Sequence, residues 1–129
     1  FRPEQATAQK IKKGETETLT LRLVRNPDIL AEVATFRQPK GRPRIVVGFA
    51  AETQDLLENA QAKMAAKRLD FIVANDVSRE DSGFGTETNK VIFLSADGKQ
   101  EQWPLLSKTE VAERVIEQIV RSLTPTLPT

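Results

Sequence analysis

The sequence predicts a layered α/β fold, with helices on both faces of a largely parallel β-sheet and an antiparallel hairpin at one edge. Three observations support this prediction. Two largely apolar runs, 45–51 and 69–77, have the composition of strands that are covered on both faces. A helical pattern precedes the first run, and another separates the two. An Asp-Gly pair after a third apolar run is typical of a hairpin turn.

The amino-terminal part is predicted to contain a loop, a strand and a helix. Residues 1–17 are polar and are expected to form a flexible basic loop. Residues 19–24 alternate apolar and polar side chains, as a half-buried strand does. Asn26 is a suitable N-cap, Pro27 fits the first helical position and Asp28 complements the helix dipole. The apolar stripe of this helix consists of Ile29, Leu30, Val33, Ala34 and Phe36.

The middle of the chain is predicted to form a β-α-β unit. A turn over 38–44, rich in proline and glycine, ends the first helix. The strand 45–51 follows, then a helix over 53–67, then the strand 69–77. The inward face of this helix is expected to hold Leu56, Leu57, Ala60 and Met64.

The carboxyl-terminal part is predicted to contain a hairpin and a final helix. A polar loop over 78–89 leads to the strand 90–95, whose expected antiparallel partner is 102–106. Ser107 and Glu110 have the capping-box spacing that begins a helix. Its inner face is expected to hold Val111, Val115, Ile116, Ile119, Val120 and Leu123. We therefore expect a Rossmann-like α/β/α core over 18–124 and a frayed tail over 125–129.

The composition narrows the chemistry. Without cysteine or histidine, the chain cannot use thiol catalysis, thiolate or imidazole metal ligands, or a histidine general base. Lysine, arginine, carboxylates and backbone dipoles remain, and they suit reactions at phosphate. A net charge of +1 gives no reason to expect a nucleic-acid partner. No apolar run is long enough to span a membrane, so we expect a cytoplasmic protein.

Ligands of a parallel α/β sheet bind beyond the carboxyl ends of its strands. Three segments are predicted to lie there: 26–28, 48–53 and 75–78. Asp28 is a helix cap and also a candidate ligand of a nucleotide-bound Mg²⁺. Phe49 is either a core residue or one face of a base or ribose pocket.

Two helical lysines are candidates for anion binding. Lys63 and Lys67 are four residues apart on one helix face, where like charges repel by roughly 0.2–0.5 kcal/mol. An anion that bridges them would remove this cost. Alternatively, both point into water and are screened by Glu58 or Asp70.

The cluster Lys10-Ile11-Lys12-Lys13 lies in the polar amino-terminal segment. It is either a solvated basic loop or a loop that closes over a polyphosphate, where a lysine can neutralise charge as a phosphoryl bond breaks. Neither a GxGxxG nor a GxxxxGK[ST] phosphate-binding motif occurs in the sequence.

Five segments resemble, in order and spacing, the bacterial phosphopantothenoylcysteine synthetase family. They are 10–13, 26–30, 46–53, 69–78 and 83–89, and they cover nearly the whole chain. The resemblance implies a ligase of coenzyme A biosynthesis that joins 4′-phosphopantothenate to cysteine with CTP and Mg²⁺. It also implies an acyl-cytidylate intermediate. The substrate carboxylate displaces pyrophosphate from the α-phosphorus, and the cysteine amine then displaces CMP.

The resemblance also implies roles for individual residues. Lys10 would be the catalytic lysine of a flexible loop over the triphosphate. The residues implied to bind the nucleotide are Lys10, Pro27, Asp28, Ile29, Leu30, Phe49, Lys63 and Lys67. No metal ligand is implied.

In that family the domain continues upstream of the position of Phe1. We therefore expect this chain to be the carboxyl-terminal part of a synthetase domain, weakly active or inactive alone. FMN is expected only if a fused decarboxylase domain exists elsewhere in the full protein. The family also implies a homodimer. Two other functions stay open: a non-catalytic dimerisation or assembly module of that enzyme, and a dinucleotide-binding reductase domain, which the missing glycine fingerprint disfavours.

Overall fold

The computed structural model describes residues 1–9, 14, 17–37, 41–78 and 85–124. Its main element is a four-stranded sheet in the order β3-β4-β6-β7. The strands are β3 (Val47–Glu52), β4 (Phe71–Asp76), β6 (Val91–Ser95) and β7 (Gln100–Gln102). β3 pairs with β4 in parallel, whereas the β4–β6 and β6–β7 pairs are antiparallel. The α/β class is confirmed, and the sheet is mixed.

The prediction of a largely parallel sheet is therefore wrong for the described residues. A parallel pair needs a crossover that carries the chain back to the same end of the sheet. A helix provides this crossover between β3 and β4, but no described helix lies between β4 and β6. The chain therefore turns back after β4, and β6 runs antiparallel to it.

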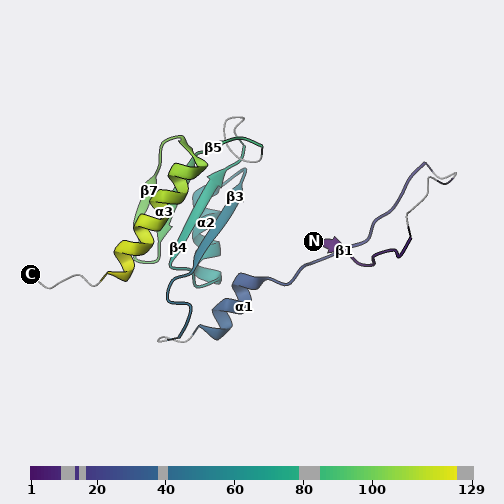
Figure 1. Cartoon of the computed structure of the whole chain (residues 1–129), viewed down its shortest axis with the longest axis horizontal. Helices are drawn as coiled ribbons and strands as arrows, with labels where there is room; N and C mark the ends of the chain where they lie inside the picture. The colour runs from purple at the N-terminus through teal and green to yellow at the C-terminus, as the bar shows by residue number, and fades with distance from the viewer. Residues whose placement is uncertain (10–13, 15–16, 38–40, 79–84, 125–129) are drawn as a thin grey trace, which may run out of the picture.

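Helices cover both faces of the sheet (Figure 1). They are α1 (Ile29–Phe36), α2 (Leu56–Ala66) and α3 (Lys108–Leu123). α2 packs on one face, where Leu30 and Val33 of α1 join the same apolar cluster. α3 packs on the opposite face. None of the helices in the described part of the chain is long and apolar enough to cross a membrane.

Alternation along β4 divides the apolar core between the two faces. Ile72 and Ala74 face α2, whereas Phe71 and Val73 face α3. The α2-face core also contains Val46, Ala50, Ala60, Leu69 and Leu94. The α3-face core also contains Val91, Phe93, Trp103, Val111 and Val115. On the α3 face the rings of Phe93 and Trp103 stack, with centroids 5.3 Å apart.

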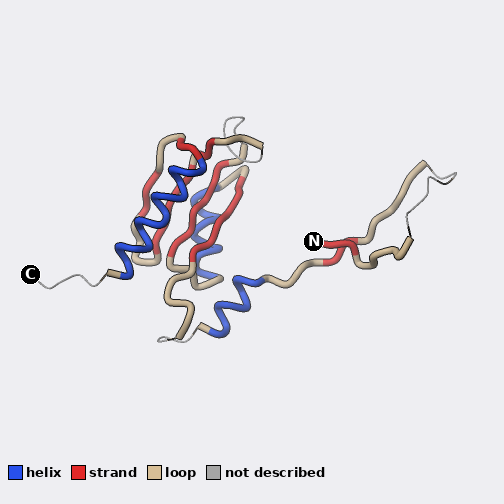
Figure 2. Tube along the Cα trace, in the orientation of Figure 1, coloured by secondary structure: helices blue, strands red, loops and turns tan. Residues whose placement is uncertain are grey.

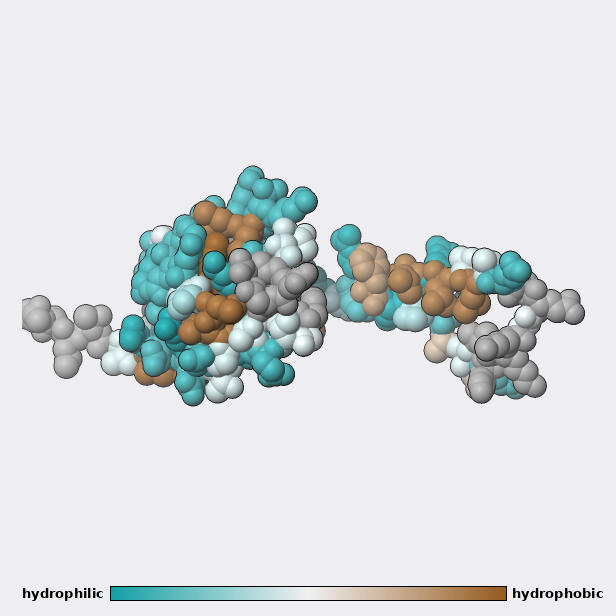
Figure 3. Space-filling view, turned by 90° about the horizontal axis from the view of Figure 1, so that it is seen from above, coloured by the Kyte–Doolittle hydropathy of each residue, from teal (hydrophilic) through white to brown (hydrophobic). Residues whose placement is uncertain are grey.

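The amino-terminal segment lies outside the main sheet. β1 (Arg2–Pro3) and β2 (Leu23–Val24) form a separate two-stranded antiparallel sheet, which extends away from the α/β core in Figure 2. The predicted strand over 19–24 is thus reduced to two residues. Its leucines at 19, 21 and 23 are exposed. Figure 3 shows apolar side chains gathered along the amino-terminal arm, which is the extended segment that contains β1 and β2. The apolar side chains whose alternation predicted a half-buried strand therefore face solvent.

α1 begins later than predicted. Its N-cap is Asp28, whose side chain accepts a hydrogen bond from the Ala31 N–H. The side chain of Asn26 instead accepts a hydrogen bond from Arg2. Ile29 and Phe36 are exposed, so the stripe that packs against the core is narrower than the predicted one.

The hairpin and the last helix follow the sequence closely. Gly98 adopts a positive φ of 94°, as the Asp-Gly turn requires, although β7 begins at Gln100 rather than Gln102. Both reciprocal bonds of the capping box between Ser107 and Glu110 are present. On α3, the exposed residues Ile116, Val120 and Leu123 were wrongly assigned to the inner face.

A second two-stranded sheet fixes the start of α3. β5 (Thr88–Asn89) and β8 (Leu106–Ser107) pair antiparallel, and β8 leads directly into the helix. The N–H of Lys108 also donates to the Glu87 carbonyl at 3.0 Å. These contacts hold the first turn of α3 beside the carboxyl end of β4.

Candidate functional site

β3 separates the candidate residues between the two faces of the sheet. Gly48 and Ala50 are buried toward α2, and a Cβ added at Gly48 would lie 2.4 Å from Leu69 Cδ1. The side chain of Phe49 points to the opposite face and is 70% exposed. The interpretation of Phe49 as a core residue is therefore wrong, and its ring is accessible to a ligand.

Lys63 extends from α2 toward the carboxyl end of β3. Its ammonium forms an ion pair with the carboxylate of Glu52, the last residue of β3. The other carboxylate oxygen of Glu52 accepts a hydrogen bond from Asn59 at 3.4 Å. A cation thus lies near the end of the strand where ligands of such sheets bind.

Lys67, the C-cap residue of α2, pairs with Asp28 at the start of α1. The Nζ–Oδ2 distance is 3.1 Å, and Oδ1 of Asp28 accepts the Ala31 N–H at 3.1 Å. The cap hydrogen bond first, and then Lys67, lower the pKa of Asp28 below its ordinary value. This pair joins the Pro27–Leu30 segment to the carboxyl-terminal end of α2, which leads into the start of β4. The prediction that residues 26–28 lie beyond the carboxyl ends of the strands is therefore wrong, because a crossover helix ends at the side where the next parallel strand begins.

The two helical lysines therefore have separate carboxylate partners. Among the described ion pairs, the lysines pair with Glu52 and Asp28 rather than with the predicted Glu58 or Asp70. Asp70 instead pairs with Arg37 at 2.7 Å and accepts the Val46 N–H at 2.7 Å. This pair, which the sequence analysis did not identify, links the end of α1 to the amino-terminal side of the parallel strands.

The polar residues at the end of β4 have loop contacts as well as access to a pocket. Asp76 Oδ1 accepts hydrogen bonds from the N–H and the hydroxyl of Ser78, at 3.0 and 2.6 Å. Asn75 Nδ2 donates to Asn89 Oδ1 at 3.3 Å. Asp76 is thus used in a turn, whereas Asn75 and Asn89 line the pocket beside it.

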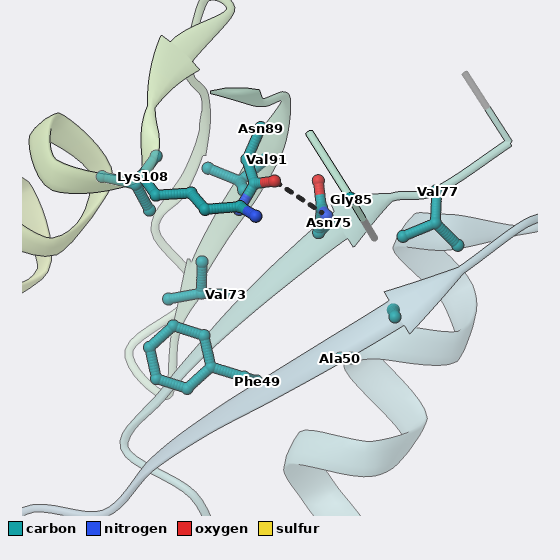
Figure 4. Close-up of a pocket in the computed structure, with 11 residues that line it drawn as sticks. Phe49, Ala50, Val73, Asn75, Val77, Gly85, Asn89, Val91 and Lys108 are labelled. Atoms are coloured by element: carbon teal, nitrogen blue, oxygen red, sulfur yellow. Dashed lines mark hydrogen bonds between the residues drawn. The ribbon is translucent and has the colours of Figure 1, made fainter. Parts of the chain in front are cut away.

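This pocket lies on the α3 face and has a volume of about 380 Å³ (Figure 4). Its polar side chains are Asn75, Asn89 and Lys108. Its apolar lining comprises Phe49, Ala50, Ala51, Val73, Val77, Val91 and Val111, together with Gly85. A mostly apolar cavity of this size with a few convergent polar groups is typical of a small-molecule site.

The sequence analysis missed Lys108. A capping box indicates where a helix begins, but it does not show which cavity the first helical side chain will reach. Lys10, the predicted catalytic residue, lies outside the described residues, as do Lys12 and Lys13. Within the described part of the chain, no group of three or more acidic side chains could hold a metal ion.

Comparison with known proteins identifies the family. The DNA/pantothenate metabolism flavoprotein C-terminal domain family matches residues 1–123. The chain belongs to this family. The coenzyme A biosynthesis bifunctional protein CoaBC of Bacillus subtilis is 42% identical over 119 residues, which cover 92% of this chain and 28% of that protein. The protein of the same name from Vibrio cholerae is 43% identical over 120 residues, covering 92% and 29%.

A solved structure supports the same assignment. The crystal structure of the C-terminal domain of a CoaBC protein matches with a TM-score of 0.64 and 33% identity. The match covers 80% of this chain and 45% of that one. The chain thus spans less than a third of the length of the curated relatives named above and less than half of this solved domain. The resemblance recognised in the sequence is confirmed at the level of the family.

Within this family member, the predicted site residues form two groups. Asp28 and Lys67 are in contact, and Lys63 lies one helical turn from Lys67 on the same helix. Phe49 lies on the other face of β3, beside the pocket. No described strand pairs with the outer edge of β3, so this edge is open among the described residues.

Proposed function

We propose that this chain is part of a ligase that joins 4′-phosphopantothenate to cysteine with CTP in coenzyme A biosynthesis. The observation that carries the proposal is the family match over residues 1–123, together with about 40% identity to proteins named for coenzyme A biosynthesis. We further propose that the chain contributes nucleotide-binding residues and only part of the complete site.

The proposed reaction has two steps. An oxygen of the substrate carboxylate attacks the α-phosphorus of CTP, and the bond to pyrophosphate breaks. The amine of cysteine then attacks the acyl carbon, loses a proton and expels CMP as the amide forms. Both steps move negative charge onto phosphate oxygens, so cations near those oxygens accelerate them. Lys10 is the proposed catalytic cation.

The nucleotide is proposed to cross the outer edge of β3. Lys63 and Lys67 belong to the α2 side, and the ring of Phe49 belongs to the α3 side. A ligand that contacts all three must pass the edge where, among the described residues, β3 has no neighbouring strand. The Pro27–Leu30 segment lies next to Lys67, because Asp28 pairs with it, and is therefore proposed to contact the same nucleotide.

The ion pairs on α2 allow such binding at low cost. Each pair has one partner that is nearly half exposed, Lys63 or Asp28, and one that is less exposed, Glu52 at 14% or Lys67 at 29%. Ion pairs in such settings contribute about 0–1 kcal/mol, because water already solvates the charges. A triphosphate carries several negative charges and can therefore replace Glu52 or Asp28 as the partner of a lysine.

Mg²⁺ is proposed to arrive with the triphosphate. Both carboxylate oxygens of Asp28 already have partners, and the described residues contain no acidic cluster for a metal. Mg²⁺ commonly binds through phosphate oxygens, water and one or two carboxylates, which agrees with these residues. The ion would offset charge on the phosphates.

Calorimetric titration with CTP and with ATP, each with Mg²⁺, tests nucleotide binding. Lys63→Ala and Lys67→Ala are each expected to weaken CTP binding about tenfold, because a charged contact to phosphate is lost. Lys99→Ala is the matched control, since Lys99 also forms an exposed ion pair, with Glu101 on the hairpin. Equal CTP affinity in all variants would refute the proposed contacts.

A role in dimer assembly is a second proposal, supported by the amino-terminal arm. Leu19, Leu21 and Leu23 expose apolar side chains on this arm, and exposed apolar groups of this kind mark protein contacts. We propose that the arm contributes to a homodimer. Sedimentation equilibrium should show a dimer that Leu21→Asp dissociates, whereas a monomeric wild-type chain would exclude this role.

A further inference from the structure

α1 carries the proposed nucleotide-binding segment at its start, but few apolar contacts hold the helix. Of its eight residues, Ala34 is buried, and Leu30 and Val33 are half-buried against the α2-face core. Figure 1 shows α1 at the margin of the α/β core, next to the amino-terminal arm. A helix of this length is not stable in water on its own. Polar contacts at its two ends therefore contribute to its position.

Arg37, the C-cap residue of α1, holds the end of the helix. Its guanidinium donates hydrogen bonds to the Arg68 carbonyl at 2.9 Å and to the Arg44 carbonyl at 2.8 Å. It also pairs with the carboxylate of Asp70, with Nη2 lying 2.9 Å from Oδ1 and 2.7 Å from Oδ2. One side chain thus joins α1 to the segment before β3 and to the turn between α2 and β4.

Asp70, the charged partner of Arg37, is itself held in place. Its Oδ2 accepts the Val46 N–H at 2.7 Å, and the Asp70 N–H donates to the Val46 carbonyl at 3.0 Å. The Arg37 side chain is 19% exposed, so its bonds are partly shielded from water. Hydrogen bonds between charged groups are stronger in such a setting than on an open surface. Arg37 therefore restrains the end of α1 strongly.

The contact at the start of α1 is more open. Asp28 meets Lys67 through one carboxylate oxygen, and the Asp28 side chain is 49% exposed. In the proposed function, a triphosphate can replace Asp28 as the partner of Lys67. α1 would then keep its apolar contacts and those of Arg37. The contacts of Arg37 thus remain as a polar restraint on α1 while the nucleotide is bound.

We propose that Arg37 is a positioning residue for nucleotide binding: its contacts hold α1 where the Pro27–Leu30 segment and Lys67 reach the same nucleotide. This inference rests on the proposed function for the identity of the ligand. If α1 occupies this place only part of the time, the apparent Kd rises in inverse proportion to that fraction. Lysine cannot replace Arg37, because a single ammonium lacks the planar fork that reaches both carbonyls and the carboxylate.

Calorimetric titration of the full chain with CTP and Mg²⁺ tests the positioning role. Arg37→Lys and Arg37→Gln are each expected to weaken CTP binding about tenfold, as when α1 is correctly placed about a tenth of the time. Val115→Ala is the control, because it removes a buried side chain from the α3-face core and leaves α1 untouched. It should lower the urea midpoint without changing CTP affinity. Wild-type affinity in the Arg37 variants, or an equal loss in Val115→Ala, would overturn the inference.

The carboxyl group of Asp28 reports the position of α1 without any ligand. The cap hydrogen bond from Ala31 first, and then Lys67, lower the pKa of Asp28. The cap bond lies at the start of α1 and should persist in Arg37→Lys, whereas the contact with Lys67 should be lost for part of the time. Carbon-13 NMR titration should therefore show a higher pKa of Asp28 in Arg37→Lys and the wild-type pKa in Val115→Ala. An unchanged pKa in Arg37→Lys would contradict a restraint by Arg37.

Failure of this inference is distinguishable from failure of the proposed function. If Lys67→Ala weakens CTP binding but Arg37→Lys does not, the nucleotide site stands and the role of Arg37 is refuted. If the wild-type chain does not bind CTP, the proposed function is refuted. The titration of Asp28 then still decides whether Arg37 holds α1 in place.

Discussion

The two faces of β3 differ in how completely this chain covers them. On the α2 face, Ala50 and Gly48 are buried, and the lysines of α2 are paired with Glu52 and Asp28. On the α3 face, Phe49 is exposed beside a cavity of about 380 Å³. The cation of that cavity, Lys108, has no ion-pair partner among the described residues.

This difference separates stability from binding along one strand. Side chains directed to α2 contribute to the core through close packing, so their loss should affect folding. Side chains directed to α3 near the carboxyl end of β3 border the open pocket, so their loss should affect ligand binding. The strand alternation that places neighbours on opposite faces is what makes the two roles separable.

The largest expected effect is on the α2 face. Ile72→Ala removes a side chain that is 1% exposed and packed in the α2-face core. We expect the free energy of unfolding to fall by about 2–5 kcal/mol, because the substitution leaves a cavity. Urea denaturation measures this change. A loss below about 1 kcal/mol would contradict the description of this face as closed.

The matched substitution on the α3 face is Phe49→Ala. Because the ring is 70% exposed, the free energy of unfolding should change by no more than about 0.5 kcal/mol. Binding of CTP and of 4′-phosphopantothenate should weaken, since the ring lies between the proposed nucleotide path and the open pocket. Urea denaturation and calorimetry separate the two effects, and a strongly destabilised variant would show that the ring has a structural role.

The charge of Asp28 allows the stability of the α2 side to be tested by a change of pH. Its lowered pKa means that its contribution to stability is complete above the unfolded value, about 4, and is lost as pH falls through the folded pKa. Asp28→Asn keeps an N-cap acceptor but removes the charge that pairs with Lys67. The variant should be less stable near pH 7 and approach the wild type in acid. Thermal unfolding between pH 2 and 7 measures this convergence, and parallel curves would contradict it.

The lysines of α2 are also expected to have a small effect on folding. Lys63→Ala and Lys67→Ala should each reduce the free energy of unfolding by about 0–1 kcal/mol, because both pairs are partly exposed. Their effect on CTP binding should exceed their effect on stability. If a substitution lowers the free energy of unfolding by more than it weakens the free energy of CTP binding, the ion pair has a mainly structural role.

Local sequence signals predicted the fold where the contacts are local. The capping box at Ser107 and Glu110 and the turn at Asp97-Gly98 are determined by residues close in sequence, and both occur as predicted. The direction of β6 could not be read from its own residues, because it depends on whether a helix precedes the strand. The exposure of residues 19–24 was also missed, since alternation alone does not show which surface covers a strand.

The candidate site was predictable in part for the same reason. The resemblance selected Asp28 and Lys67, which lie in contact although they are far apart in sequence. The ion pair of Arg37 with Asp70 and the place of Lys108 at the pocket depend on tertiary packing. No residue spacing in the sequence indicates either of them.

The most direct test of the account is one NMR titration of the methyl-labelled chain, first with Mg²⁺ and CTP and then with 4′-phosphopantothenate. We predict that CTP shifts methyl groups near the α2 lysines, such as those of Leu30 and Met64. The acid should then shift those of Val73, Val91 and Val111, which line the open pocket on the other face. Shifts confined to a single face for both ligands, or no shifts with either, would contradict the account, in which CTP contacts the α2 face of β3 and the acid contacts the α3 face.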